Sequence, residues 1–259
     1  MLPLHRHEFD TGRIVVAETA GEIVGFGATL VRSGVAYIAD LFVCPDQQSE
    51  GTGAALLEAL LGDHTGPRFT LASTDPRARA LYERFGMHPV VEYSYLHARP
   101  DEVAIERLDA SGVELETTTV GAEILAIDRG VTQRDRHHDL HHAETHLGAR
   151  TLRARRRGET VGYAQVVHPI WWHPSHPDAV RIGPVVALDP DDLVPILAAT
   201  IMNARGLRTD SLGPFVPLDH PAHAALVDAG FVVHDRDLLM ASRPDLIDSG
   251  RYFPAVDTA

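Results

Sequence analysis

The first hundred residues alternate between short apolar runs and polar turns, a pattern that predicts a meander of strands followed by helices. Asp75 and Pro76 supply an N-cap and a first helical position, and Gly86 supplies a C-terminal stop for the same helix. The expected elements are strands at 13–17, 23–31 and 35–43, a helix at 52–61, a strand at 68–73, a helix at 75–87 and a strand at 90–98.

From about residue 100 a similar order of elements begins again, this time with two helices in front. We therefore predict two domains of related topology, 1–99 and 113–243, joined by a linker at 100–112. The fold class is α/β (α+β), each domain being a mixed, mostly antiparallel sheet flanked by helices. The expected elements are helices at 121–131 and 135–147, strands at 151–158, 160–168 and 181–190, a helix at 191–205, a strand at 207–216, a helix at 221–230 and a strand at 231–241.

The stretch PDQQSEGTGAALLEALL, which begins at Pro45, places two glycines between the end of a strand and the start of a helix. Free N–H groups point outward at a helix N-terminus, and the helix dipole adds partial positive charge there. Glycine lets the backbone approach a ligand closely and adopt positive φ. This combination predicts an anion site, most often one for phosphate.

Two common phosphate motifs do not fit this stretch. The P-loop requires Gly-Lys-Ser/Thr, and the chain contains no lysine. The dinucleotide fingerprint requires three spaced glycines, whereas GFGATL at 25–30 lacks the third and lies inside a strand pattern.

The pattern Gln48-x-x-Gly51-x-Gly53 resembles the pyrophosphate loop of the GNAT family of N-acetyltransferases. LFVCP precedes it as the fourth strand and the following proline do in that family. DPRARALYERFGM is similar to the second family signature, Asn-x-x-Ala-x-x-Leu-Tyr-x-x-x-Gly-Phe, with Asp75 for Asn and Met87 for Phe. The chain as a whole resembles a two-domain bacterial GNAT protein, which implies tandem GNAT folds.

The resemblance implies an enzyme that transfers acetyl from acetyl-CoA to a primary amine, by direct attack in a ternary complex. Tyr82 matches the family's tyrosine near the CoA sulfur, and a phenol with a pKa near 10 can protonate a thiolate of similar basicity. A non-catalytic acyl-CoA sensor or scaffold is the alternative function. The implied acetyl-CoA-binding positions are Leu41, Phe42, Val43, Gln48, Ser49, Glu50, Gly51, Thr52, Gly53, Ala54, Asp75 and Tyr82.

Attack by an amine also requires a base. Asp40 interrupts the apolar run YIA…LFV and lies where several family members carry an acidic residue, so it is our first candidate for the catalytic base. Glu92 on a later strand and a chain of waters are the other candidates. The alternative for Asp40 is a purely structural, hydrogen-bonded carboxylate.

GNAT domains begin with a strand and two helices, which form much of the acceptor pocket. Only about a dozen residues precede the first meander strand here, so we expect the first copy to lack its leading helices. The second domain or a partner in a homodimer would then complete the acceptor site.

The second domain resembles the C-terminal domain of two-domain GNAT proteins. Its stretch DHPAHAALVDAGF is similar to the second signature but lacks the tyrosine, and its loop position reads DPDDL. Because these aspartates would repel a pyrophosphate, the resemblance implies a degenerate copy that does not bind CoA normally.

Two further segments are chemically conspicuous. Five histidines lie within 137–146, which we interpret as a solvated helix face and not a metal site. Trp171 and Trp172 lie in a long loop, either as a wall of the acceptor site or as interface packing.

Composition limits the partners. Hydrophobic residues make up 44% and charged residues 23%, as in ordinary globular proteins, and the net charge of −13 argues against nonspecific nucleic-acid binding. No run approaches the roughly 18 apolar residues of a membrane span, and the start has no apolar signal core, so we expect a cytoplasmic protein that acts on a small-molecule amine. Cys44 is the only cysteine, and we expect it to be a small buried residue.

Overall fold

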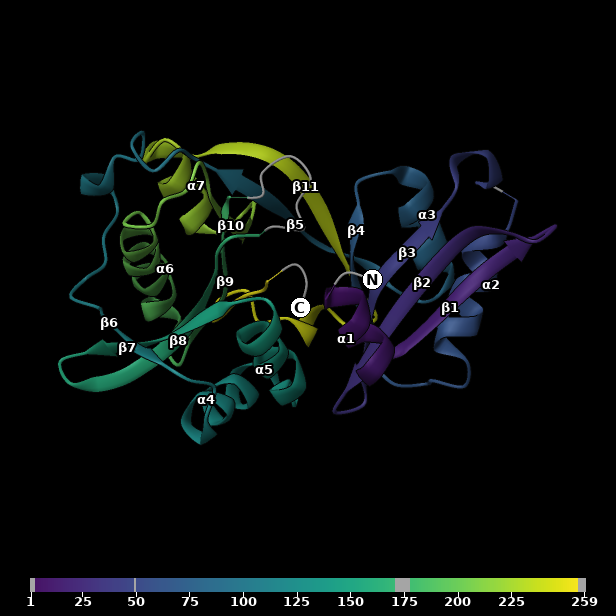
Figure 1. Ribbon diagram of the computed structural model, residues 1–259, viewed down its shortest axis with the longest axis horizontal. Coiled ribbons are helices and arrows are strands. Elements are labelled where there is room, and N and C mark those ends of the chain that lie inside the picture. Colours follow the sequence, from purple (N-terminus) through teal and green to yellow (C-terminus); the bar gives the residue numbers. More distant parts are fainter. Residues whose placement is uncertain (1–2, 49, 171–177, 256–259) are drawn as a thin grey trace. The chain divides into compact units, whose positions relative to one another are not determined.

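The computed structural model describes residues 3–48, 50–170 and 178–255. The chain forms two compact units (Figure 1). The first contains residues 1–90 and 238–246, and the second contains residues 91–237 and 247–259. Their extents differ from the predicted domains because the end of the last long strand, β11 (Val232–Ala241), belongs to the first unit. The prediction that one domain binds acetyl-CoA and the other is a degenerate copy stays a prediction.

The first unit is an antiparallel meander of β1, β2 and β3, continued by β4, which is parallel to β3, and by the end of β11. Its elements are α1 (Pro3–Thr11), β1 (Arg13–Thr19), β2 (Glu22–Arg32), β3 (Val35–Val43), the 3-10 turn η1 (Pro45–Gln47), α2 (Thr52–Leu61), β4 (Arg68–Ser73), α3 (Pro76–Arg84) and the turn η3 (Pro244–Leu246).

Helices α1 and α2 cover opposite faces of this meander, α1 in front of the strands and α2 behind them in Figure 1. A Cβ atom on Gly27 would lie 2.6 Å from Leu60 Cδ1, so only glycine lets α2 pack this close to β2. The neighbouring Phe26 points to the other face, because side chains alternate along a strand. There its ring meets the ring of His5 from α1 edge to face, with the centroids 5.8 Å apart. The glycines of GFGATL are therefore packing residues.

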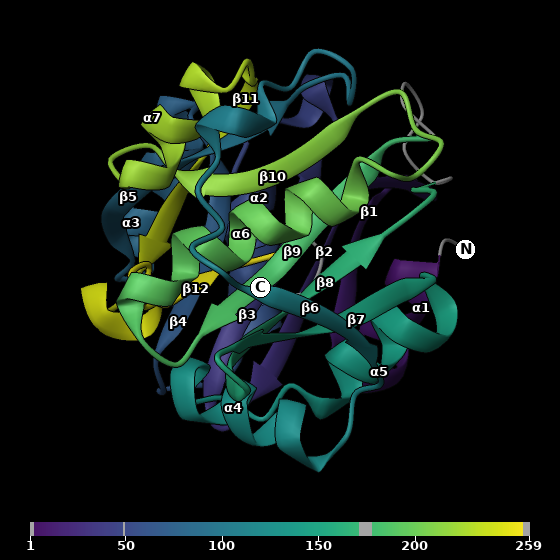
Figure 2. The ribbon, with the colours of Figure 1, turned by 90° about the vertical axis from the view of Figure 1, so that its left-hand side faces the viewer.

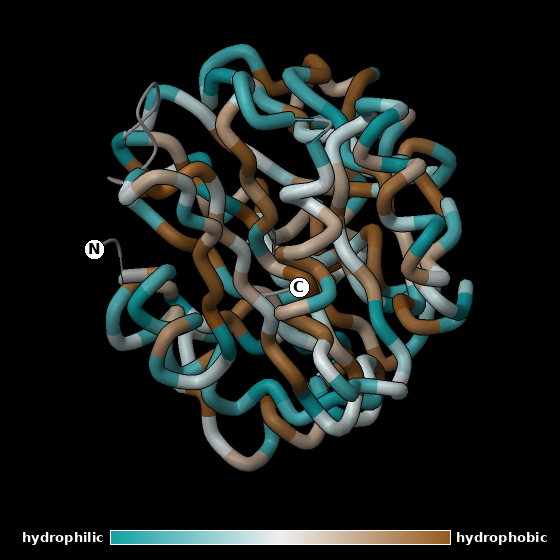
Figure 3. Tube along the Cα trace, turned by 90° about the vertical axis from the view of Figure 1, so that its right-hand side faces the viewer, coloured by the Kyte–Doolittle hydropathy of each residue, from teal (hydrophilic) through white to brown (hydrophobic). Residues whose placement is uncertain are grey.

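The apolar core of the first unit lies between the sheet and its α2 face. The hydropathy-coloured trace shows apolar stretches (brown) along strands and helices, with hydrophilic ones (teal) in the turns that join them (Figure 3). The buried members of the core are Ala36, Ile38, Leu57, Leu60, Leu61, Ala72, Tyr82, Met87 and Met240.

In the second unit the strand order is β5-β10-β9-β8-β7-β6, and β12 also pairs with β9. The elements are β5 (His88–His97), the turn η2 (Ile105–Arg107), β6 (Glu114–Thr118), α4 (Ala122–Thr132), α5 (His137–His146), β7 (Ala149–Arg156), β8 (Glu159–Val167), β9 (Val180–Ala187), α6 (Pro190–Ala204), β10 (Leu212–Pro217), α7 (Pro221–Asp228) and β12 (Tyr252–Phe253).

Helices α6 and α4 also lie on opposite faces of their sheet (Figure 2). A Cβ atom on Gly162 of β8 would lie 2.7 Å from Ile196 Cδ1 of α6. The next residue, Tyr163, points to the other face, where its hydroxyl donates a hydrogen bond to Asp128 of α4 at 2.6 Å. Neighbouring residues of one strand thus contact the two helices.

A fully buried ion pair joins α4 to the start of α5. The Arg136 guanidinium donates to both carboxylate oxygens of Asp128, at 2.5 and 3.2 Å, and also to the Tyr252 hydroxyl at 2.6 Å. Asp128 and Arg136 are each 1% exposed. A buried charge that loses its partner is strongly destabilising, so removing either residue of this pair should destabilise the second unit.

Replacing Asp128 with alanine should therefore lower the free energy of unfolding by about 3–5 kcal/mol, because it leaves the Arg136 charge buried without a carboxylate. Urea denaturation measures the change. The control is Arg129→Ala on the same helix, which breaks an exposed ion pair with Asp135 and should cost less than about 1 kcal/mol. Equal losses in the two variants would contradict this account.

The predicted mixed, mostly antiparallel sheet flanked by helices is confirmed, and its elements follow the predicted order. One expectation needs correction: a nine-residue helix, α1, precedes the first meander strand, where the sequence predicted no leading helix. The sequence also did not predict β6 or β12. No helix in the described part of the chain is long and apolar enough to cross a membrane.

Candidate functional site

The site begins where β3 separates from β4. The two strands pair only from Ala36 to Ile38, opposite Arg68 to Thr70, so within the described residues β3 runs on to Val43 without β4 beside it. On its other edge β3 stays paired with β2 as far as Val43, with one bulge between Ile38 and Asp40. The last residues of β3 therefore have one edge unpaired by β4.

The glycine loop lies directly after this open strand. The Gln48 side chain donates from Nε2 to the carbonyl of Val43 at 3.1 Å and so folds the loop back onto the end of β3. Gly51 is the N-cap of α2 with φ of +90°, a left-handed conformation that favours glycine. No side chain among the described residues caps α2, so its first N–H groups are available to an anion.

The second glycine of the loop lies close to α3. A Cβ atom on Gly53 would lie 3.1 Å from Leu81 Cδ2, so a larger residue there would require the Leu81 side chain to shift. The two glycines thus have different roles, one in backbone conformation and one in the close approach of two helices.

The structure brings most of the predicted acetyl-CoA residues together along the end of β3, the loop and the first turn of α2. These are Leu41, Phe42, Val43, Gln48, Glu50, Gly51, Thr52, Gly53 and Ala54. Ser49 lies outside the described residues.

Asp75 is the N-cap of α3 and Tyr82 lies on that helix, and the two have different surroundings. The Asp75 carboxylate caps the helix by accepting from the Arg77 N–H at 2.8 Å, and hydrogen bonds from Arg77 lower the pKa of this carboxyl group. Tyr82 is 6% exposed and belongs to the core of the first unit. The catalytic role of its hydroxyl stays a prediction.

Asp40, the candidate base, lies on β3 directly after the bulge and is not alone. Helix α1 places Glu8 and His5 beside it, and ligand atoms of the three side chains lie within 4.8 Å of one another. His5 Nε2 is 3.7 Å from Asp40 Oδ2. The Glu8 residue is 1% exposed. Buried Glu8 Oε2 and Asp40 Oδ2 have no hydrogen-bond partner while both carboxyls are ionised.

This environment favours a protonated carboxyl group. Burial, the nearby Asp40 charge and a hydrogen bond to Asp40 together raise the pKa of Glu8 to about 8, and burial is the largest of these causes. Burial also raises the pKa of Asp40, while a hydrogen bond from Glu8 and the charge of His5 act against that rise. A proton shared between the two carboxyl groups would supply the missing donor, and the raised pKa of each group favours this arrangement.

Sequence reasoning identified Asp40 but missed Glu8 and His5. The signal was present in HRHEFD, where His5 and Glu8 are three residues apart and share one helix face once this stretch is helical. The apolar pattern there was too short to predict a helix.

The other residues that the sequence singled out either do not belong to this cluster or lie outside the described residues. Glu92 on β5 lies 3.7 Å from the guanidinium of Arg236, in a pair exposed to solvent. Cys44 is exposed, which corrects the expectation that it is buried, because the chain leaves β3 at this residue. The histidines at 138, 141 and 146 are exposed on α5, as expected for a solvated face. Trp171 and Trp172 lie outside the described residues.

The corresponding helix of the second unit has a filled N-terminus. Asp189 caps α6 by accepting from the N–H of Asp191 at 3.0 Å. Asp192 in the first turn forms an ion pair with Arg156. Carboxylates of the chain itself therefore occupy the region in which a phosphate would bind.

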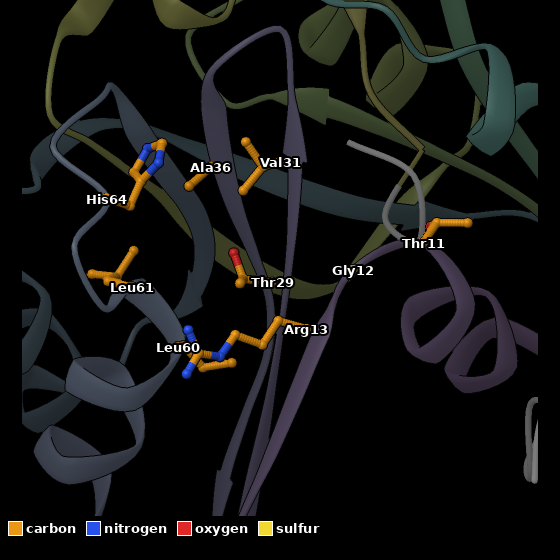
Figure 4. Close-up of a pocket in the computed structure, with 9 residues that line it drawn as sticks. All are labelled: Thr11, Gly12, Arg13, Thr29, Val31, Ala36, Leu60, Leu61 and His64. Carbon is orange, nitrogen blue, oxygen red and sulfur yellow. The ribbon is translucent and has the colours of Figure 1, made fainter.

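A pocket of about 300 Å³ is also present in the first unit (Figure 4). One of its lining residues is Ala36, at the start of β3, whereas the glycine loop follows the end of that strand. No predicted site residue lines this pocket. The lining residues are Thr11, Gly12, Arg13, Thr29, Val31, Ala36, Leu60, Leu61 and His64.

Comparison with known proteins agrees with this geometry. Residues 10–88 match the family model of the acetyltransferase (GNAT) domain. No curated protein sequence matches the chain. This part of the chain is thus a GNAT acetyltransferase domain, the domain of an acyltransferase.

Solved structures share the fold over nearly the whole chain. A protein from Pyrococcus horikoshii assigned to the acetyltransferases has a TM-score of 0.71 and 16% identity, covering 99% of this chain and 83% of its own. A tandem GNAT protein from the clavulanic acid biosynthesis pathway has a TM-score of 0.59 and 16% identity, covering 93% of this chain and 88% of its own. A GCN5-related N-acetyltransferase from Sphaerobacter thermophilus has a TM-score of 0.56 and 16% identity, covering 95% of this chain and 83% of its own.

The raised pKa of Glu8 predicts a pH-dependent stability. Its carboxyl has an ordinary pKa of 4.5 and one of about 8 in the folded protein, so the folded state binds this proton more tightly. The free energy of unfolding should therefore fall as the pH rises from 4.5 to 8, by at most about 1.4 kcal/mol per pH unit. Glu8→Gln, which cannot ionise, should remove this decrease.

Urea denaturation of both proteins between pH 5 and pH 8.5 measures the difference. Glu58→Gln on the exposed side of α2 is the matched control and should keep the wild-type slope. A Glu8→Gln variant with an unchanged slope would show that Glu8 titrates normally.

Proposed function

We propose that the protein is an N-acetyltransferase that transfers the acetyl group of acetyl-CoA to a primary amine of a small molecule or peptide. The observation that carries this proposal is the uncapped N-terminus of α2 at Gly51, directly after a strand whose edge is open. A helix N-terminus with free N–H groups binds phosphate, and an open strand edge hydrogen-bonds an extended amide chain.

The described residues fit acetyl-CoA. Backbone groups of Leu41 and Val43 would pair with the pantetheine arm, because β4 does not pair with this part of β3. N–H groups between Gln48 and Ala54 would hold the pyrophosphate, and no lysine is needed because the backbone and the helix dipole supply the positive potential. When bound, acetyl-CoA supplies an acetyl group activated as a thioester.

Direct transfer then needs a base and an acid. In our proposal the acceptor ammonium loses one proton to Asp40, and the neutral nitrogen attacks the thioester carbonyl. The C–N bond forms as the C–S bond breaks. The thiolate of CoA takes a proton from the Tyr82 hydroxyl, so CoA leaves as a thiol. The tyrosinate then takes the remaining extra proton from the nitrogen of the new amide. Finally, Asp40 releases its proton to solvent.

We infer that the second unit does not bind acetyl-CoA in the same way. The Asp189 cap and the acidic first turn of α6 support this inference, because they place negative charge where the pyrophosphate would lie. The non-catalytic alternative, an acyl-CoA sensor, differs from our proposal in lacking turnover with any amine.

Calorimetric titration with acetyl-CoA should give one site per chain, and Gly51→Asp should abolish it by introducing a negative charge at the mouth of α2. Gly21→Asp is the matched control: Gly21 has φ of +85° and Gly51 of +90°, and a Cβ atom on either would meet nothing within 4 Å. Backbone strain is therefore similar in the two variants, and only the first should lose binding. Two sites per chain would contradict the inference about α6.

Tyr82→Phe should lower turnover by roughly 10²-fold and change the affinity for acetyl-CoA far less, because the ring stays in place and only the hydroxyl with its donated proton is lost. Release of the CoA thiol in the presence of a panel of primary amines measures turnover. Unchanged turnover would assign Tyr82 a packing role, and no turnover of the wild-type protein with any amine would favour the sensor.

A further inference from the structure

The α1 side of the β2–β3 pair carries both charge and aromatic surface. Asp40 lies opposite Ala28 and Phe42 lies opposite Phe26 in the strand register, so Asp40 and Phe42 share one face. The Phe26 and Phe42 rings stack with their centroids 5.3 Å apart. Helix α1 lies on this same face, because His5 contacts Phe26.

Glu8 is the unusual member of this face. It is 1% exposed, its Oε2 atom has no hydrogen-bond partner, and one of its carboxylate oxygens lies within 4.8 Å of one of Asp40. Burying a carboxylate beside another carboxylate is unfavourable unless a proton or a cation is shared between them. His5 supplies only part of this compensation, because its Nε2 atom is 3.7 Å from Asp40 and its side chain is 35% exposed.

We propose that Glu8 and Asp40, together with the Phe26–Phe42 ring pair, form the acceptor subsite, and that it takes the ammonium of a primary amine bearing an apolar or aromatic group. This inference rests on the proposed function and names its substrate class. The carboxyl pair supplies one negative charge for one ammonium, and the exposed ring of Phe42 supplies apolar and cation–π contact.

The features on this face distinguish among possible occupants. Phe42 is 58% exposed and offers a broad apolar surface on the same strand face as Asp40, which suits a hydrocarbon substituent better than a polyhydroxylated one. The three ligand atoms lie within 4.8 Å of one another, a separation that also allows an ammonium to donate hydrogen bonds to separate carboxylate oxygens. A divalent metal is the alternative occupant, and the experiment below distinguishes the two.

The proton step balances within this subsite. The ammonium binds while the pair holds one proton and one negative charge. The N–H bond then breaks, its proton moves to the ionised carboxylate, and the nitrogen lone pair becomes free to attack. Either Glu8 or Asp40 can carry the negative charge. Replacing one of the two with a neutral amide should therefore be tolerated for amine binding, whereas replacing both should not.

Calorimetric titration of the full chain at pH 7 with 2-phenylethylamine, in the absence of a thioester, tests the proposal. Glu8→Gln and Asp40→Asn should each change the affinity by less than about threefold, whereas the double variant should weaken binding by at least about tenfold, as for a lost hydrogen bond to a charged group. The neutral analogue 2-phenylethanol should bind at least about tenfold more weakly than the amine.

Phe42→Ala tests the aromatic part, with Phe9→Ala as its matched control. Both rings are strongly exposed, at 58% and 61%, but Phe9 is adjacent to the buried Glu8 on α1 and is itself turned to solvent. Phe42→Ala should weaken binding about threefold or more, and Phe9→Ala should leave it unchanged.

Three results would overturn the inference: equal binding of the alcohol and the amine, wild-type affinity in the double variant, or equal effects of the two phenylalanine variants. Stoichiometric Zn²⁺ or Mn²⁺ binding that is lost in the double variant, without amine binding, would make the cluster a metal site instead. A titration of the same samples with acetyl-CoA separates the two proposals. Acetyl-CoA binding without amine binding would refute only the proposed acceptor subsite. Amine binding without acetyl-CoA binding would refute only the proposed acetyltransferase activity.

Discussion

Two buried threonine hydroxyls hold the point at which β3 separates from β4. Thr29 donates to the carbonyl of Tyr37 and Thr70 donates to the carbonyl of Ile38, each at 2.9 Å. Strand pairing with β4 ends at this point, and the bulge follows within two residues. The bulge sets which side chain of β3 faces α1, because a one-residue insertion exchanges the two faces of a strand. The open edge and the orientation of Asp40 both depend on this short segment.

The free edge and the α1 face of β3 have different roles in the proposed reaction. Its free edge and the glycine loop offer backbone groups, which suit a neutral amide chain and a pyrophosphate without any lysine or arginine. Its α1 face offers a buried carboxyl pair, which suits a cation and its proton. Because burial raises the pKa of both Glu8 and Asp40, the pair favours a shared proton, which lowers its repulsion of an anionic donor.

The two units show how one loop changes the properties of a shared fold. In the first unit a glycine in the left-handed region begins α2, and no described side chain caps it. In the second unit Asp189 caps α6, and Asp192 is paired with Arg156. The N-terminus of α6 is therefore satisfied by its own chain, which supports our inference that it does not bind a pyrophosphate in the same way. The buried Asp128–Arg136 pair serves stability in the same unit.

The sequence by itself determined the order of nearly all the helices and strands, because each has a clear apolar period and is bounded by turn or capping residues such as Asp75 and Gly86. It also indicated the candidate anion site, since glycine spacing at a helix start is a local property. Only the tertiary structure decided what surrounds Asp40. Glu8 is far from Asp40 in the sequence, and the short helix α1 gains its stability from packing on β2 and not from its own residues. The shared proton, and with it the charge of the site, follows from a burial that no local pattern encodes.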